Sequence, residues 1–192
     1  MYTSPFVRDG GSERAWTEHI ATDLGAVALL EAVRRVHLPD RIAATLDEIL
    51  GALLAESAGD EGGAALPRPT RQAVHQFHLA GRYPDVVIND PRDRLFAVVE
   101  AQRGRADDRH IAKLVTSYIP RSGARLGILV AEGWRGASTG HPAWTECTVP
   151  VAVVVARDGS PEPEYDVAWV HHPTDLGGEC GEPTFVGQHR EG

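Results

Sequence analysis

Three polar side chains interrupt or close two segments that are otherwise apolar. Asp85 lies within the apolar segment 83–88, while Glu100 and Gln102 close the apolar run that begins at Leu95. Burying a carboxylate at the end of an apolar strand is costly unless another group pairs with it. Side chains alternate along a strand, which predicts one shared face here. That face carries Phe96, Val98, Glu100 and Gln102.

The two carboxylates predict a metal site. Residues 89–93, Asn-Asp-Pro-Arg-Asp, are typical of a turn, so the flanking strands should form a hairpin that brings Asp85 close to Glu100. Adjacent carboxylates repel one another, and a divalent cation removes that conflict. Oxygen ligands suit Mg²⁺, or Mn²⁺ in its place. The expected ligands are Asp85, Glu100 and the backbone carbonyl of Ala101.

Hydrophobic periodicity predicts the elements that must position these residues. Two amphipathic helices are expected first, followed by a loop at 57–70, three strands, one helix and three further strands. The expected helices are 12–36, 40–56 and 107 to about 120–123, and the expected strands are 74–79, 83–88, 95–101, 125–131, 148–156 and 165–170.

This order predicts an α/β fold with a mixed β-sheet flanked by helices. The first three strands are connected too tightly for crossover helices and should form an antiparallel meander, whereas the helix from 107 lets the fourth strand run parallel to the third. We expect a single domain over residues 1–172. It comprises N-terminal helices within 1–58, a motif-bearing core at 72–131 and extra C-terminal strands, followed by an irregular tail at 173–192.

One stretch of the chain resembles a known nuclease superfamily. Pro84-Asp85, fourteen residues, and then Glu100-Ala101-Gln102 are similar to the motif of the PD-(D/E)XK, or restriction-endonuclease-like, nucleases in their E-x-Q variant. The resemblance covers about residues 72–131 and implies an αβββαβ core. It also implies an acidic pair that binds Mg²⁺ and a catalytic Gln102 that orients the attacking water, in the place where most members carry Lys.

The resemblance extends weakly beyond the motif. Asp107 to His110 and Tyr118 are similar to a further signature of E-x-Q branches, but the Gln that precedes the Tyr by four residues in related nucleases is Leu114 here. His110 can equally be a surface helix residue and Tyr118 a core residue.

Acidic residues on the first helix often join the site in this family. Glu13 and Glu31 are the candidates, although a solvated helix edge also explains both. Basic residues after the motif suit backbone phosphates. They are Arg103, Arg105, Arg109 and Lys113.

Charge and composition limit the function classes. The 192 residues carry a formal net charge of -8, which is unusual for a general nucleic-acid binder, yet residues 82–125 hold nine basic and six acidic side chains, net +3. No apolar run is long enough to span a bilayer, and the start of the chain lacks a secretory pattern. Cys147 and Cys180 are expected to be free thiols in a cytoplasmic protein.

Two functions remain open from the sequence. The first is a Mg²⁺-dependent nuclease that hydrolyses phosphodiester bonds, in DNA rather than RNA by family resemblance, in repair, mobile elements or phage defence. The second is a catalytically inactive module of the same fold that binds nucleic acid or a partner protein. Both are compatible with a homodimer or a larger complex, and neither involves a membrane.

Overall fold

The computed structural model describes residues 13–57, 70–72, 84–157 and 163–173. Its helices and helical turns are α2 (Glu13–Ile20), α3 (Asp23–Arg34), α4 (Asp40–Ser57), α5 (Asp108–Ala112), η1 (Lys113–Tyr118), α6 (Ile119–Ser122), η2 (Gly136–Gly140) and η3 (Pro142–Glu146). Its strands are β1 (Thr70–Gln72), β2 (Val86–Asn89), β3 (Leu95–Ala101), β4 (Leu126–Ala131), β5 (Val151–Arg157) and β6 (Glu164–His171).

The strands form one mixed sheet in sequence order, β1-β2-β3-β4-β5-β6. β1, β2 and β3 are antiparallel neighbours, β3, β4 and β5 run parallel, and β6 returns antiparallel to β5. The predicted mixed α/β architecture is confirmed. β3 and β4 are buried along nearly their whole length, as their continuous apolar runs predict for central strands.

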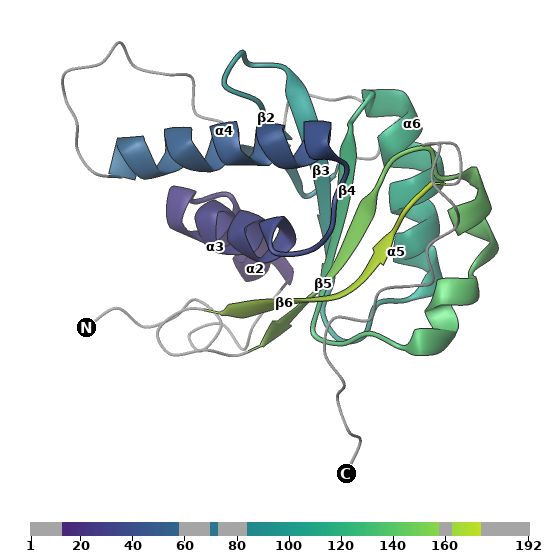
Figure 1. The fold of residues 1–192 in the computed structure, drawn as a ribbon. Coiled ribbons are helices and arrows are strands. Elements are labelled where there is room, and N and C mark those ends of the chain that lie inside the picture. The colour runs from purple at the N-terminus through teal and green to yellow at the C-terminus, as the bar shows by residue number, and fades with distance from the viewer. Residues whose placement is uncertain (1–12, 58–69, 73–83, 158–162, 174–192) are drawn as a thin grey trace.

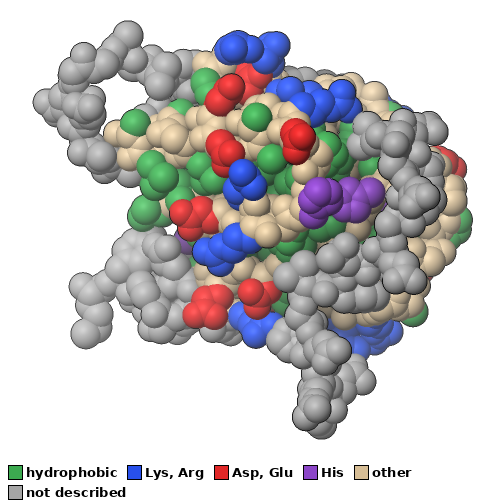
Figure 2. Space-filling model, viewed as in Figure 1, with side chains coloured by type: hydrophobic (Ala, Val, Ile, Leu, Met, Phe, Trp, Pro, Cys, Tyr) green, Lys and Arg blue, Asp and Glu red, His purple; other side chains and the backbone are tan. Residues whose placement is uncertain are grey.

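Helices cover both faces of the sheet (Figure 1). α2, α3 and α4 pack against one face, where the core includes Leu46, Val99 and Ile128. α5, η1, α6 and η3 cover the other, where Tyr118 and Trp144 join the core. Figure 2, drawn from the same side, shows acidic and basic side chains interspersed on the visible face. No described helix is long and apolar enough to cross a membrane.

The predicted helix at 12–36 is two helices, which corrects the sequence expectation. The chain breaks at Ala21-Thr22, where the Thr22 hydroxyl caps α3 by accepting a hydrogen bond from Gly25 N at 3.1 Å. A Cβ at Gly25 would lie 2.1 Å from the carbonyl oxygen of His19, so only glycine permits the approach of α2 to α3. Apolar residues keep their helical spacing across the break, so hydrophobic periodicity alone predicts a single helix.

The motif-bearing strands differ from expectation in detail. β3 has its predicted bounds, whereas β2 begins at Val86 rather than at residue 83. The predicted strand 74–79 and most of the tail 173–192 lie outside the described residues. Phe96 was expected to share a face with Glu100, but it packs in the core beneath α2–α4, because the β2–β3 register shifts between Ile88 and Asn89.

Candidate functional site

Asp85 and Glu100 lie together at the carboxyl end of β3. The Asp85 N–H donates to Val99 O at 3.1 Å, and its Oδ2 accepts from Ala101 N at 2.7 Å. Glu100 is fully buried on the α5–η1 side of the sheet. Both carboxylates act on the pKa of Tyr118, which lies on that side. The structure therefore places Asp85 beside the Ala101 peptide, next to Glu100 at the end of β3.

Lys113 provides a cation for the buried glutamate. Its Nζ donates a hydrogen bond to Glu100 Oε1, and its side chain is 25% exposed. Burial lowers the Lys113 pKa, but the hydrogen bond and charge of Glu100 outweigh burial, so the net pKa lies above its ordinary value. Lys113 is thus held charged at Glu100, whereas the sequence suggested a phosphate as its partner.

A π-helical segment turns Lys113 and Tyr118 toward each other. Residues five apart diverge on an α-helix, but η1 has the wider π winding, and Lys113 Nζ lies 5.2 Å from the Tyr118 ring centroid. Tyr118 is fully buried, and burial followed by the charge of Glu100 raises its pKa. Its hydroxyl therefore keeps its proton. Tyr118 packs in the core and also belongs to the cluster formed by Asp85, Glu100, Lys113 and Tyr118.

Asp107 and His110 form the next part of the cluster. Asp107 caps α5 by accepting from His110 N at 2.9 Å, and the same oxygen lies 2.8 Å from His110 Nδ1. Because an ionised carboxylate only accepts, Nδ1 carries the proton, and Nε2 lies 3.9 Å from Glu100 Oε1. Burial raises the Asp107 pKa, but the hydrogen bonds from His110 outweigh it and hold the pKa low. His110 thus lies between the helix cap and Glu100, at a distance from Glu100 that is too long for a hydrogen bond.

Gln102 anchors the loop that follows β3. Its Nε2 donates to Arg105 O at 2.5 Å, and its Oε1 accepts from Asp107 N at 3.3 Å. The side chain is buried, with 2% exposed. Its amide therefore connects β3 to the N-cap of α5, and its predicted contact with an attacking water stays a prediction.

The remaining predicted residues lie in different surroundings. Arg103 pairs with Glu132 at 3.1 Å, Arg109 is exposed on α5, and Arg105 lines a pocket. Glu31 is exposed on α3 and lies 4.0 Å from Arg35. The side chain of Glu13 lies outside the described residues.

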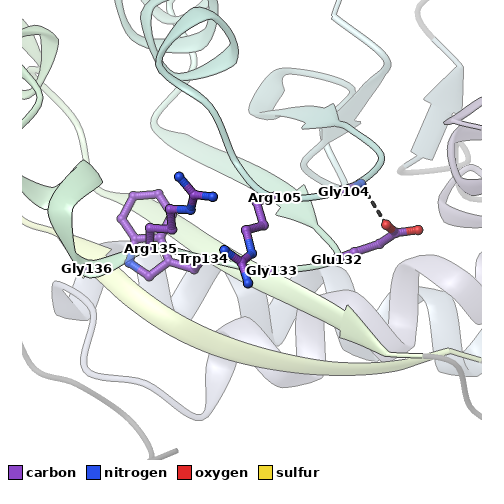
Figure 3. A pocket seen from close by; sticks show the side chains of 7 residues that line it. All are labelled: Gly104, Arg105, Glu132, Gly133, Trp134, Arg135 and Gly136. Atoms are coloured by element: carbon purple, nitrogen blue, oxygen red, sulfur yellow. Dashed lines mark hydrogen bonds between the residues drawn. The ribbon is translucent and has the colours of Figure 1, made fainter. Parts of the chain in front are cut away.

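The sequence did not single out the pocket residues contributed by the segment after β4, among them Trp134 and Arg135 (Figure 3). Their signal is positional. The stretch Gly133-Trp134-Arg135-Gly136 directly follows a central parallel strand, and the carboxyl ends of such strands are where ligands bind in open α/β sheets.

Two carboxylates at this end of β3 are hard oxygen donors of the kind that Mg²⁺ prefers. Within the described ranges, no three His, Cys, Asp or Glu residues are grouped so as to hold a metal ion. Mg²⁺ commonly takes one or two carboxylates and completes its shell with water and substrate phosphate. Asp85 and Glu100 therefore fit a cation that also binds water and phosphate. They supply too few ligands for a cation that is bound by protein groups alone.

Family models and curated proteins were compared with the chain. No protein-family model matches the chain, and no curated protein matches it. The geometry and charge of the site are therefore the basis for assigning a function.

Proposed function

We propose that this protein is a metal-dependent phosphodiesterase that cleaves nucleic acid, built on a restriction-endonuclease-like αβββαβ core. The observation that carries the proposal is the position of Asp85 against the Ala101 backbone, next in sequence to the buried Glu100 on which the ammonium of Lys113 lies. An antiparallel meander followed by a helix and a parallel strand supports the same core.

The donor chemistry favours a cation here. Asp85 and Glu100 are two hard oxygen donors near the end of β3, and Asp85 Oδ2 lies 2.7 Å from Ala101 N. A divalent cation would be held by Asp85, Glu100 and the Ala101 carbonyl. Such a cation supplies polarisation of a phosphoryl oxygen and a bound water of lowered pKa. Mg²⁺ is the proposed cofactor, with Mn²⁺ as its substitute.

The protein's own side chains have separate roles in this proposal. Lys113 must leave Glu100 in part when a metal binds, and its charged amine then lies beside the phosphate that enters. Gln102 holds the loop 103–107 in place through its two hydrogen bonds. Tyr118, neutral and buried, keeps its hydroxyl proton within the cluster. His110, fixed by Asp107, presents Nε2 to the Glu100 side, where it can accept a proton.

One observation favours the non-catalytic alternative. Lys113 already neutralises Glu100 without a metal, and a buried carboxylate paired in this way is stable as a structural element. In that case the fold would bind nucleic acid or a protein without cleaving it. The two functions differ in whether metal binding and cleavage occur at all.

A cleavage assay with a metal series separates them. The parent protein is incubated with linear, circular and single-stranded DNA and with RNA, in Mg²⁺, Mn²⁺ or chelator. We expect metal-dependent cleavage, with DNA the preferred substrate, that stops in chelator. Absence of cleavage by both the parent and Gln102→Lys, together with no metal bound at Asp85 and Glu100, would refute the enzyme and leave the binding module.

A further inference from the structure

A pocket lies beside the candidate site, where β3 and β4 end. Its volume is about 560 Å³, and its lining is Gly104, Arg105, Glu132, Gly133, Trp134, Arg135 and Gly136 (Figure 3). This size falls within the range of roughly 300–1,000 Å³ that holds small ligands. Its place at the carboxyl edge of two parallel strands is the usual position of a ligand site in an open α/β sheet.

Backbone hydrogen bonds hold the two walls of the pocket together. Glu132 N donates to Gly104 O at 2.8 Å, and Ala106 N donates to Gly133 O at 2.9 Å. Arg105 and Gly133 form a parallel bridge that extends the β3–β4 pairing into the loops. The pocket is therefore formed before any ligand arrives, which lowers the cost of ordering on binding.

The pocket has a positive charge. Its single acidic group, Glu132, accepts from Gly104 N at 2.7 Å and from Arg103 Nε at 3.1 Å, so its charge is already compensated. Arg105 and Arg135 are both exposed, and neither guanidinium has an ion-pair partner within the described residues. Two guanidinium groups on one small pocket, beside a single carboxylate that is already paired, favour a phosphate or another anion.

Trp134 gives the pocket an aromatic wall that is supported from behind. Its indole stacks on Trp169 with centroids 5.6 Å apart and planes 13° apart, and Trp169 meets Trp144 edge to face at 4.8 Å. This packing fixes the indole in position. A rigid aromatic surface beside arginines is the combination with which proteins hold the bases and phosphates of single strands.

We propose that this pocket binds one nucleotide of a single-stranded nucleic acid, with its phosphate on Arg105 and Arg135 and its base against Trp134. The inference builds on the proposed function. The bound nucleotide would lie near the scissile phosphate, either on the cleaved strand or on the strand beside it. The hydrogen bond from Gln102 Nε2 to Arg105 O joins the pocket to the carboxylate end of β3. A base paired within a duplex cannot reach an aromatic wall, so the ligand is single-stranded.

The first test measures binding without cleavage. Fluorescence anisotropy gives the Kd of a labelled thymidine oligonucleotide in chelator, for the parent and for Arg105→Gln/Arg135→Gln. We expect at least tenfold weaker binding for the double variant. The slope of log Kd against log salt should fall by about 0.7 for each phosphate that the variant no longer binds. The matched control is Arg92→Gln/Arg121→Gln, two exposed arginines outside the pocket, which should bind within twofold of the parent.

The second test blocks the pocket and leaves its charge unchanged. A Cβ at Gly136 would meet no protein atom within 4 Å, so Gly136→Leu projects into open space and should not disturb the fold. We expect about tenfold weaker binding for Gly136→Leu and no weakening for Gly51→Leu, a control whose Cβ also meets nothing within 4 Å. Trp134→Phe, which keeps an aromatic ring, should lose less affinity than Trp134→Leu.

The outcomes separate the pocket from the nuclease. The parent should bind the oligonucleotide in chelator whether or not it cleaves DNA in metal. The pocket proposal is overturned if the parent binds no oligonucleotide, if it binds blunt duplex DNA as tightly as single strands, or if both Arg105→Gln/Arg135→Gln and Gly136→Leu bind like the parent.

Discussion

The β2–β3 hairpin carries a buried acidic residue at each end, and the two ends are built differently. At the turn, Asp90 is 2% exposed and accepts from Arg94 Nε at 2.9 Å and Arg94 Nη2 at 2.6 Å. Arg125 adds a contact at 3.4 Å. At the open end, Glu100 is fully buried and its cation, Lys113, comes from the helical segment after β3.

The difference lies in the kind of group that pairs with each carboxylate. Asp90 is a single carboxylate with two guanidinium groups, one of them four residues away, so it is locally satisfied and its role is to hold the turn. At the open end, Glu100 is paired with the ammonium of Lys113, and burial followed by the charge of Glu100 raises the pKa of Tyr118. A buried carboxylate that shifts the pKa of a neighbouring ionisable group is typical of a functional site rather than of a structural one.

The largest effect is expected from removing the charges at the open end. Asp85→Asn and Glu100→Gln should each lower the cleavage rate by more than about a hundredfold. Loss of a residue that only hydrogen-bonds to a metal ligand costs about 10- to 100-fold, and loss of the ligand itself should cost more. Asn at position 85 can still accept from Ala101 N, and Gln keeps the volume of Glu100, so circular dichroism should show an intact fold. Initial rates of DNA cleavage in Mg²⁺ provide the measurement.

The matched control is Asp90→Asn at the other end of the hairpin. It should leave the cleavage rate within about threefold while lowering the free energy of unfolding by about 1–2 kcal/mol, through the loss of charge-assisted hydrogen bonds to Arg94. An equal loss of cleavage in Asp90→Asn and Glu100→Gln would show that the two ends do not differ in the way proposed.

The next largest effect concerns Lys113. Lys113→Met removes the cation at Glu100, so cleavage should fall by about tenfold to a hundredfold while Mn²⁺ binds at least as tightly as in the parent, because metal and ammonium compete for the same carboxylate. Isothermal titration with Mn²⁺ and single-turnover cleavage give the two quantities. If Lys113→Met binds Mn²⁺ more weakly, Lys113 supports the metal site instead of competing with it.

Gln102 gives a smaller effect that differs between two substitutions. Gln102→Ala loses the hydrogen bonds to Arg105 and Asp107, so cleavage should fall by about tenfold as the loop loses its anchor. Gln102→Lys keeps a donor for Arg105 O and restores the residue that most of the resembled family carries, but it loses the acceptor for Asp107 N, so it should retain more of the rate than Gln102→Ala. Cleavage equal to that of the parent in Gln102→Ala would remove Gln102 from the catalytic account.

Features that depend on neighbouring residues could be predicted from the sequence, whereas features that depend on contacts between distant segments could not. The apolar run 95–101 predicted β3 to the residue, and the alternation along it placed Glu100 on a site face. The shift that carries Phe96 to the other face and the π winding that brings Lys113 close to Tyr118 could not be predicted from local sequence patterns. The pocket joins loops far apart in the chain, so only one of its walls, residues 133–136 after β4, had a signal in the sequence.

The smallest expected effect is the pH dependence of stability, which should have opposite signs at the two ends. Burial raises the Asp90 pKa, but the hydrogen bonds from Arg94 and Arg92 bring it below its ordinary value of 3.8, so its stabilisation is present above that pH and is lost as the pH falls. The raised pKa values of Lys113 and Tyr118 stabilise the fold below their ordinary values of 10.5 and 10.0, and this is lost as the pH rises.

Urea unfolding across the pH range checks this difference. Asp90→Asn should flatten the acid limb of the stability profile and leave the alkaline limb, while Tyr118→Phe should flatten the alkaline limb alone. A parent protein whose stability is unchanged between about pH 9 and 11 would contradict the pairing of Lys113 and Tyr118 with Glu100.

The most direct test of the central claim is anomalous diffraction from crystals soaked in Mn²⁺. The account predicts a peak between the carboxylates of Asp85 and Glu100, with Lys113 Nζ withdrawn from Glu100 and no peak at Asp90. A structure at saturating Mn²⁺ with no peak at Asp85 and Glu100, and with Lys113 still paired to Glu100, would contradict it.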